Sequence, residues 1–216
     1  SIHYRIKVTN LFEQFSQTRT ISNGKRRRRA TCLSQSEVMT ILVLYHLSGY
    51  KNLKAFYLQE ILRHHSSDFP RLCSYQRFVQ LQSRCVMPLF FYLLTKLGSC
   101  TGISFIDATP LKVCHNLRIP SHRVFRGSAE RDKSSTGWYY GFKLHLAINE
   151  KGEILGFYLT SANVDERETV DWITQDLWGK LIGDKGYISK SLFEKLMQRG
   201  LKLITKLRKN MKNRFV

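Results

Sequence analysis

The sequence predicts an α/β protein whose mixed β-sheet core, of five strands with flanking helices, follows an all-helical N-terminal region. Two observations lead to this class. Apolar residues recur at helical spacing up to about residue 98, and beyond it they form short continuous or alternating runs that are typical of strands. With 216 residues, of which 43% are hydrophobic, the chain is long enough for one large domain or two small ones. We divide it into residues 1–98 and 99–216.

Three helices are predicted in the first region from apolar stripes and end signals: 34–48, 52–64 and 74–97. The first begins with a capping box, in which Ser34 is followed three residues later by Glu37, and it stops at Gly49. The third contains Pro88 and is expected to bend there. Before these helices, residues 18–32 are rich in arginine, and we expect a flexible basic arm that contacts phosphate or is simply a solvated loop.

Five strands and two helices are predicted in the second region. The strands are 103–109, 140–148, 154–160, 180–184 and 201–207, and the helices are 166–178 and 189–199. The second strand alternates, with Leu144 and Leu146 on one face and Lys143 and His145 on the other. Gly152 lies in the turn to the third strand, so these two strands are expected to be antiparallel neighbours.

The charge of the chain is strongly positive and unevenly distributed. Lysine and arginine outnumber aspartate and glutamate by 35 to 16, a formal net charge of +19. Residues 149–184 are the exception, with eight acidic against three basic side chains, a net of −5. This pattern favours a polyanionic partner, because Lys and Arg that bind phosphates release condensed counterions. A ribosome-like or merely sticky basic protein is the other interpretation.

The sequence contains no sign of a membrane or secreted protein. No apolar run reaches the roughly 18 residues that a membrane span needs, and no signal peptide is visible. The chain has five cysteines, an odd number, and they are widely spaced. This pattern indicates reduced thiols rather than disulfides or a zinc site. These observations favour a cytoplasmic protein without a membrane partner.

Two of the predicted strands end in aspartate, the first at Asp107 and the fourth at Asp184. If the helix over 166–178 is a crossover connection, these strands can lie parallel and adjacent, about 4.8 Å apart, so that both carboxylates meet at one sheet edge. Carboxylates that close repel, and a divalent cation relieves the repulsion. Oxygen ligands without a Cys or His cluster favour Mg²⁺ or Mn²⁺, which support phosphoryl transfer. Taken singly, each aspartate is also typical of a turn or a helix cap.

Five short motifs occur in one order along the second region. They are Ile-Asp-Ala-Thr-Pro at 106–110, Cys-His-Asn at 114–116, Gly-Trp-Tyr-Tyr-Gly-Phe-Lys-Leu-His-Leu at 137–146, Asn-Val-Asp at 163–165 and Gly-Asp-Lys-Gly-Tyr at 183–187. With them, the chain resembles the bacterial insertion-sequence transposases of the IS4-like DDE group, most closely the IS982 type. The resemblance covers essentially the whole chain, including Leu-Ser-Gln-Ser-Glu-Val-Met-Thr and Ser-Gly-Tyr in the helical region.

The resemblance implies a DNA-binding and assembly region followed by an RNase H-like catalytic domain, which uses three carboxylates and two divalent metal ions to cleave and join DNA strands. Asp107 matches the first carboxylate and Asp184 the second. The third, a Glu on a later helix, is expected beyond Val216, so we interpret the chain as a truncated transposase. The implied partners are double-stranded DNA, both terminal inverted repeats and target, and further copies of the chain. The implied location is the bacterial cytoplasm, at the nucleoid when DNA is bound.

No other acidic residue is assigned to the site. Glu194 comes too early for the third carboxylate and is interpreted as a surface helix residue. Asp165, Glu166 and Glu168 are interpreted as favourable charge at a helix N-terminus, although Asp165 is also considered as a metal ligand. The missing carboxylate favours a second hypothesis, a catalytically inactive DNA-binding remnant. A stand-alone RNase H-like nuclease would need a further carboxylate that the pattern does not reveal.

Basic side chains in loops and strands around the predicted site are candidates for phosphate contacts. They are Arg26, Arg27, Arg28, Arg29, His115, Arg118, His122, Arg123, Arg126, Lys143, Lys185, Lys206 and Lys209. Solvated loops and turns are the other interpretation of these residues. Trp138, Tyr139 and Tyr140 are candidates for stacking on an unpaired base, although aromatic residues at the start of a strand are more often part of the core.

Overall fold

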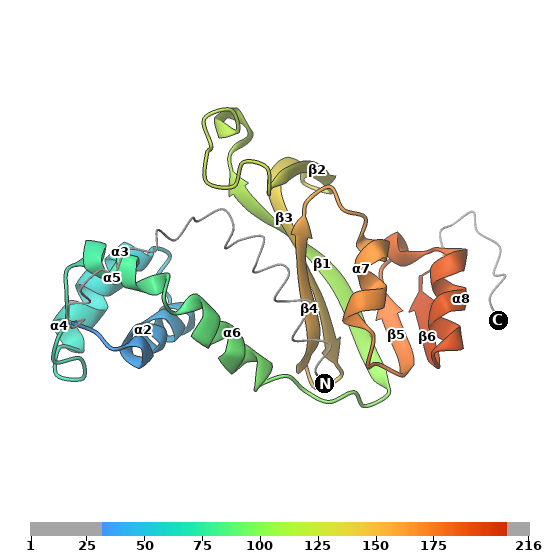
Figure 1. Cartoon of the computed structure of the whole chain (residues 1–216), viewed down its shortest axis with the longest axis horizontal. Coiled ribbons are helices and arrows are strands. Elements are labelled where there is room, and N and C mark those ends of the chain that lie inside the picture. Colours follow the sequence, from blue (N-terminus) through green and yellow to red (C-terminus); the bar gives the residue numbers. More distant parts are fainter. Residues whose placement is uncertain (1–31, 207–216) are drawn as a thin grey trace, which may run out of the picture. The chain divides into compact units, whose positions relative to one another are not determined.

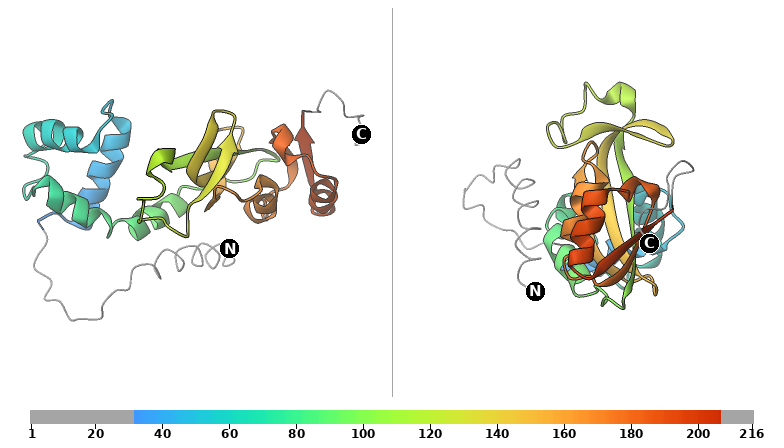
Figure 2. Two further views of the ribbon diagram at one scale, coloured as in Figure 1. Left: turned by 90° about the horizontal axis from the view of Figure 1, so that it is seen from above. Right: turned by 90° about the vertical axis from the view of Figure 1, so that its right-hand side faces the viewer.

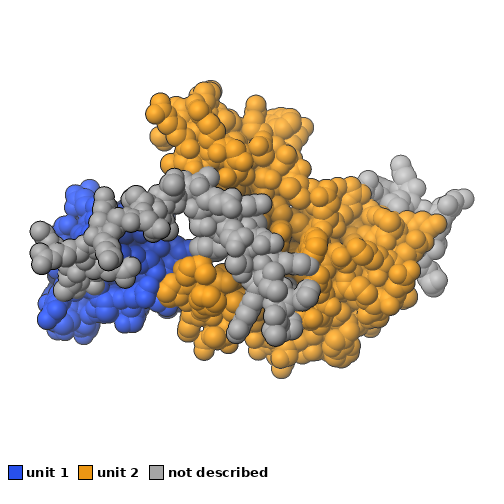
Figure 3. All heavy atoms as spheres, viewed as in Figure 1, with its two compact units in different colours: residues 1–86 blue, residues 87–216 orange. Residues whose placement is uncertain are grey.

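The structure is a computed structural model that describes residues 32–206, and the chain divides into two compact units, residues 1–86 and 87–216 (Figure 1 and Figure 3). This division places most of the helix that precedes the sheet in the second unit, whereas the sequence analysis assigned that helix to the first region. The basic arm expected over residues 18–32 lies almost entirely outside the described residues. Within the described part of the chain, no helix is long and apolar enough to cross a membrane.

The first unit is helical. Its elements are α2 (Gln35–Leu47), α3 (Leu53–Phe56), η1 (Tyr57–Ile61), α4 (Leu62–His64) and α5 (Tyr75–Gln82). The predicted capping box begins α2, since the Ser34 hydroxyl accepts a hydrogen bond from the Glu37 N–H at 3.2 Å and the Glu37 carboxylate accepts one from the Ser34 N–H at 2.6 Å. The second predicted helix is confirmed as a continuous run from α3 to α4, with a π turn at η1.

The third predicted helix is wrong as a single element. The chain forms α5 and then, after a break at residues 83–85, a separate helix α6 (Val86–Leu94). The Arg84 N–H closes the end of α5 by donating to the Leu81 carbonyl at 3.0 Å, a tight i→i−3 bond. Pro88 lies in the first turn of α6, where its missing N–H costs no helical hydrogen bond. The proline therefore stands near the start of a helix and does not bend one.

The second unit is a six-stranded mixed sheet with helices. Its strands are β1 (Ile103–Cys114), β2 (Glu130–Ser134), β3 (Gly137–Asn149), β4 (Ile154–Ser161), β5 (Gly179–Gly183) and β6 (Leu201–Thr205). Between them lie η2 (Asn116–Arg118), α7 (Glu166–Ile173), η3 (Lys185–Tyr187) and α8 (Lys190–Gln198). The strand order is β2-β3-β1-β5-β6, with β4 also paired to β3 (Figure 1). β1, β2 and β4 are antiparallel to β3, whereas β5 is parallel to both β1 and β6. The predicted α/β class, with a mixed sheet and flanking helices, is confirmed.

Two parts of the sheet differ from the prediction. The prediction does not include β2. Its sequence, Glu-Arg-Asp-Lys-Ser, has no apolar pattern, and the strand pairs only with the start of β3. The expectation that Asp107 ends the first strand is wrong, since β1 runs on to Cys114. Beyond Ile106, β1 has lost its pairing with β5 and continues through antiparallel pairing with β3. A strand with one open side tolerates Pro110, which cannot donate to a neighbour on that side.

The core of the second unit lies between the sheet and the helices α7 and α8 (Figure 2). It is formed by apolar side chains from strands, both helices and η3: Ile106, Ala147, Leu155, Val170, Ile173, Leu177, Leu181, Tyr187, Leu192, Leu196, Leu201 and Leu203. The opposite face carries the cross-strand pair Leu146 and Phe157, and the ring of Phe157 meets Phe90 of α6 edge-on with centroids 5.9 Å apart. The helices α7 and α8 therefore cover one face, and α6 contacts the other through this ring pair.

The face of β3 that looks polar in the sequence is the more deeply buried one. The His145 side chain is 0% exposed, with Nε2 3.0 Å from the Thr160 hydroxyl and Nδ1 3.2 Å from the Thr169 hydroxyl. Helix α7 packs on this face and supplies the second of these hydroxyls. Burial, and after it the charge of Lys143, lowers the pKa of His145 to about 4. The imidazole is therefore a neutral, hydrogen-bonded part of the core at pH 7.

We expect the second unit to lose stability as the pH falls from about 6.5 to about 4. In this range unfolded His145, with its ordinary pKa of 6.5, binds a proton that the folded side chain, with a pKa of about 4, does not, so acid favours unfolding. The loss should reach roughly 3 kcal/mol. Fluorescence of Trp138, Trp172 and Trp178, the three tryptophans of the chain, reports on this unit. His145→Gln should flatten the pH dependence and His115→Gln should not; equal slopes in all three proteins would contradict the assignment.

Candidate functional site

The parallel pairing of β1 with β5 determines where the two predicted aspartates lie. The last residues paired in this ladder are Ile106 and Gly183. Asp107 and Asp184 are the next residues of the two chain segments, and neighbouring strands are about 4.8 Å apart. The expectation that these strands are parallel neighbours is confirmed, and both carboxylates stand where the ladder ends.

Each aspartate uses one carboxylate oxygen to fix its own orientation. Asp107 Oδ1 accepts a hydrogen bond from the Ala108 N–H at 2.8 Å, and Asp184 Oδ1 accepts one from the Lys185 N–H at 2.6 Å, which makes Asp184 the N-cap of η3. The second oxygen of each carboxylate has no hydrogen bond or ion pair within residues 32–206, and both side chains belong to exposed residues. The site therefore presents two open carboxylate oxygens at the surface.

Two neighbouring acidic residues at the start of α7 have different environments. Asp165 is the N-cap, accepting from the Arg167 N–H at 2.9 Å, and its carboxylate is ion-paired with the Arg167 guanidinium. The Arg167 hydrogen bonds lower the pKa of Asp165 to about 2. This agrees with the predicted role in helix N-terminal charge, and the carboxylate oxygens of Asp165 are already engaged by Arg167.

Glu166 is the first residue of α7, which agrees with the predicted helix N-terminal charge, but its surroundings differ from those of Asp165. Its side chain is half-buried, and its Oε2 lies 3.3 Å from the point that a Cβ on Gly186 would occupy. Burial raises the pKa of Glu166, and the charges of Asp107 and Asp184 act in the same direction. Sequence reasoning did not single out Glu166, because helix N-terminal charge explains Asp165, Glu166 and Glu168 equally well. Only the packing of α7 against η3 separates Glu166 from the other two.

A buried tyrosine stands beside these carboxylates. Tyr187 is 0% exposed, and within the described residues its hydroxyl has no hydrogen-bond partner. Burial raises the pKa of this phenol well above its ordinary value, and Glu166, Asp107 and Asp184 contribute to the shift in that order. The ring of Tyr187 packs against Gly183, where a Cβ would come within 3.0 Å of it. The phenol thus lies beside the end of β5, within electrostatic range of the three acidic side chains.

The donor set suits a hard divalent cation held by few protein ligands. Within residues 32–206, no group of three or more His, Cys, Asp or Glu side chains converges closely enough to hold a metal ion directly. Mg²⁺ typically keeps several waters and binds through one or two carboxylates, so two aspartates with open oxygens fit it. Asp107 and Asp184 are therefore the residues that would hold Mg²⁺ or Mn²⁺.

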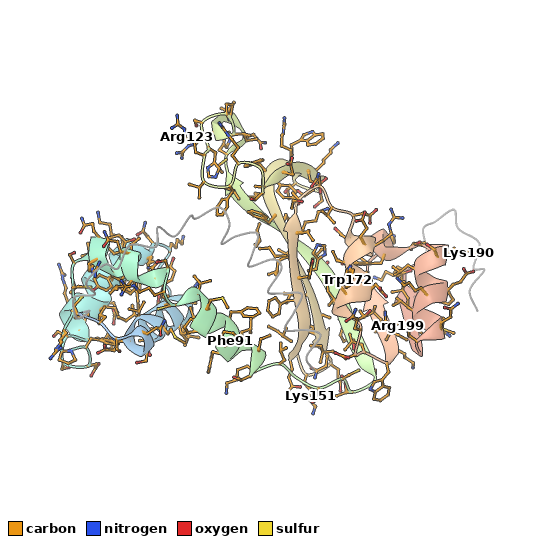
Figure 4. The ribbon with its side chains drawn as sticks, in the orientation of Figure 1. Phe91, Arg123, Lys151, Trp172, Lys190 and Arg199 are labelled. Carbon is orange, nitrogen blue, oxygen red and sulfur yellow. The ribbon has the colours of Figure 1, made fainter. Side chains whose placement is uncertain are left out.

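The predicted phosphate contacts fall on different parts of the second unit. His115, Arg118, Arg123 and Arg126 are exposed in the loop between β1 and β2, and Figure 4 shows Arg123 projecting from it. His122 is partly structural, since its ring stacks on Phe125 with centroids 5.8 Å apart. Lys185 and Lys206 are exposed after Asp184 and at the end of β6. Arg26, Arg27, Arg28, Arg29 and Lys209 lie outside the described residues.

Lys143 occupies an enclosed position. Its side chain is 13% exposed and forms an ion pair with Asp132 at 2.8 Å, while its Nζ also donates to the Val164 carbonyl at 3.1 Å. These contacts join β3 to β2 and to the segment that leads into α7. Lys143 also lies close enough to Glu166 to lower the pKa of that carboxyl.

The three aromatic residues that begin β3 divide into two groups. Tyr139 and Tyr140 are buried, which agrees with the core interpretation. Trp138 is 57% exposed and carries the Arg131 guanidinium over its ring at 5.5 Å. Of the three, only Trp138 has a ring that a base could reach.

Comparison with known protein families assigns the chain to one of them. A family described as the transposase DDE domain matches residues 97–216, which is more than half of the chain. The chain belongs to this family. The match covers the whole second-unit sheet, including both aspartates and the helices that flank them. A comparison with curated proteins gave no match.

The fold of this DDE domain protein is also found among solved structures. It is similar to the piggyBac transposase in a cryo-EM structure of its synaptic complex with hairpin DNA, with a TM-score of 0.53 and 13% identity over 87% of this chain and 46% of that chain. The present chain thus spans less than half of that protein. The crystal structure of the Mos1 strand transfer complex matches with a TM-score of 0.28 and 10% identity, over 90% of this chain and 64% of that one. The predicted RNase H-like α/β architecture is confirmed by the family match and the first structure.

We expect Lys143→Met to destabilise the DDE domain by about 1–3 kcal/mol, because it leaves the Asp132 carboxylate half-buried without its cation. Thermal unfolding followed by tryptophan fluorescence measures this loss. Lys185→Met is the matched control, since Lys185 is exposed, and it should leave stability within about 0.5 kcal/mol. If Lys143 only contacted phosphate, its replacement would weaken DNA binding without lowering the unfolding temperature.

Proposed function

We propose that this chain is the DNA-processing part of a transposase of the IS4-like DDE group, close to the IS982 type, that cleaves and joins DNA strands at insertion-sequence ends by metal-dependent phosphoryl transfer. One observation carries the proposal. Asp107 and Asp184, 77 residues apart in a member of the transposase DDE domain family, stand together at the end of the β1–β5 ladder with open carboxylate oxygens.

The two aspartates would hold Mg²⁺ or Mn²⁺ at the surface of the sheet. When bound, such ions activate a water or a 3′ hydroxyl and stabilise the leaving oxygen of a phosphodiester. The Ala108 and Lys185 N–H groups each hold one carboxylate oxygen, so the other is presented in a fixed direction without reorganisation. Exposure of both residues suits a polymeric substrate, because a DNA backbone can approach such a site without entering a pocket.

The surrounding basic side chains support double-stranded DNA as the partner. Arg118 and Arg123 are exposed on the β1–β2 loop, and Lys185 follows the second aspartate directly. Contacts to phosphates position DNA without reading its sequence, so binding should weaken steeply as salt rises. The structurally similar piggyBac protein forms a synaptic complex with hairpin DNA. By analogy, we propose that this chain assembles with further copies on terminal inverted repeats and on target DNA.

A DNA-binding protein without chemistry is the second candidate. It is favoured by the finding that, in the described part of the chain, no three acidic or other ligating groups converge on one point. The two candidates differ in whether a DNA strand is broken when a divalent cation is present. A cleavage experiment separates them directly.

We expect the full chain to nick supercoiled plasmid DNA with Mg²⁺ or Mn²⁺. Asp107→Asn or Asp184→Asn should reduce the nicking rate at least ~100-fold, because loss of even an outer-shell partner of a metal ion lowers metal affinity or activity 10 to 100-fold. Gel electrophoresis of the plasmid measures the rate. Asp176→Asn is the matched control, since Asp176 is an exposed aspartate of the same unit that lies in the turn after α7.

All four proteins should bind DNA equally in a gel-shift assay. Nicking that survives Asp107→Asn as well as it survives Asp176→Asn would contradict the catalytic assignment. DNA binding by the wild type without metal-dependent nicking would favour the second candidate.

A further inference from the structure

We infer that Glu166 is a third acidic side chain of the Asp107–Asp184 site, a positioning residue that holds the water shell of the divalent cation. This inference rests on the proposed function, because it needs a cation between the two aspartates. It assigns to Glu166 a role that helix N-terminal charge does not explain. The placement of the side chain, the local charge balance and a buried hydroxyl support it.

The placement follows from how α7 begins. Asp165 caps the helix, so Glu166 is its first residue, and α7 packs against η3. The Glu166 carboxylate reaches the backbone of Gly186, where an added Cβ would lie only 3.3 Å from Oε2. Gly186 is two residues after Asp184 in the chain. The glycine therefore leaves room for Glu166 beside the segment that carries one of the two aspartates.

The charge balance around Glu166 is unfavourable without a cation. Among the described residues, Asp107, Glu166 and Asp184 form no ion pair, although the chain carries a net charge of +19. Each is nevertheless near enough to influence the same groups: both aspartates raise the pKa of Glu166, and all three carboxylates raise that of Tyr187. Lys143, the cation that lowers the pKa of Glu166, is already paired with Asp132. Three unpaired carboxylates in one neighbourhood are the arrangement that a divalent ion relieves.

The buried Tyr187 hydroxyl is a second sign of a bound water or ion near these groups. The residue is 0% exposed, and its hydroxyl is without a hydrogen-bond partner in the described structure. It lies within electrostatic range of three carboxylates and bonds to none of them. Buried hydroxyls are almost always satisfied, by protein or by ordered water. A buried phenol without a partner, within electrostatic range of carboxylates, indicates bound water, which can both accept from the phenol and donate to a carboxylate.

A hydrated cation accounts for both the unpartnered hydroxyl and the charges. No three ligating side chains within 32–206 converge closely enough to bind a metal directly, so Glu166 is not a third inner ligand as the side chains stand. Mg²⁺ releases its waters reluctantly and is commonly held by one or two carboxylates. With Asp107 and Asp184 on the ion, Glu166 would accept hydrogen bonds from its waters. Such outer contacts typically change metal affinity by 10 to 100-fold.

The test is a Mn²⁺ titration of the full chain, in which electron paramagnetic resonance measures free Mn²⁺. Glu166→Gln keeps the shape of the side chain and removes its charge, and we expect it to weaken Mn²⁺ binding roughly 10 to 100-fold. Glu168→Gln removes the same charge from the same helix turn, at an exposed position, and should change affinity less than about threefold. Asp107→Asn should abolish measurable binding.

Unfolding temperatures separate this role from a structural one. Without metal, Glu166→Gln should unfold at the same or a higher temperature than the wild type, because it removes repulsion. With Mn²⁺ the wild type should gain stability, and Glu166→Gln should gain much less. A lower unfolding temperature of the metal-free variant would instead indicate a structural role and overturn the inference.

The outcomes also distinguish the inference from the proposed function. If Asp107→Asn weakens Mn²⁺ binding and Glu166→Gln behaves like Glu168→Gln, the metal site stands and the role of Glu166 is wrong. If the wild type binds no Mn²⁺, or if Asp107→Asn binds it unchanged, the metal site of the proposed function fails and the inference fails with it.

Discussion

The parallel ladder between β1 and β5 is the constraint on which the rest of the site depends. Two strands 77 residues apart in sequence, measured from Asp107 to Asp184, can be parallel neighbours only if the chain crosses back over the sheet, and α7 makes that crossover. The ladder ends at Ile106 and Gly183, while β1 continues alone beside β3. The two aspartates therefore lie where β5 ends and β1 continues, paired with β3 alone.

Contacts with β3 and α8 hold the crossover helix α7 in place. On one side, the Thr169 hydroxyl of α7 meets the buried His145 ring of β3. On the other, Asp171 of α7 pairs with Lys195 of α8 at 2.9 Å and with Arg199, the C-cap of α8, at 2.5 Å. Because α7 is held to β3 and to α8 at once, the direction of its first residue is determined by the core. The position of Glu166 over η3 is thus a consequence of packing and not of local helix signals.

The sequence allowed the candidate pair to be predicted but not its surroundings. Apolar runs that stop at Asp107 and Asp184 are local signals, and the crossover rule brought the two strands together. The continuation of β1 to Cys114 depends on pairing with β3, a non-local interaction, and Pro110 interrupts the apolar run of the segment itself. The break between α5 and α6 could not be read from a continuous apolar stripe. Likewise, which of the acidic residues at the start of α7 faces the site depends on the tertiary packing of the helix.

The packing of α7 shows how the carboxylates of the acidic segment 149–184 differ in their partners. Its carboxylates have environments that composition alone does not separate. Asp165 and Asp171 find arginine or lysine partners and hold α7 in place. Glu166 and Asp184 have no such partners among the described residues, although lysine and arginine are abundant in the chain. Glu166 differs from exposed carboxylates such as Glu168 because the charges of Asp107 and Asp184 raise its pKa, so the three lie close enough together for one divalent cation to relieve their repulsion.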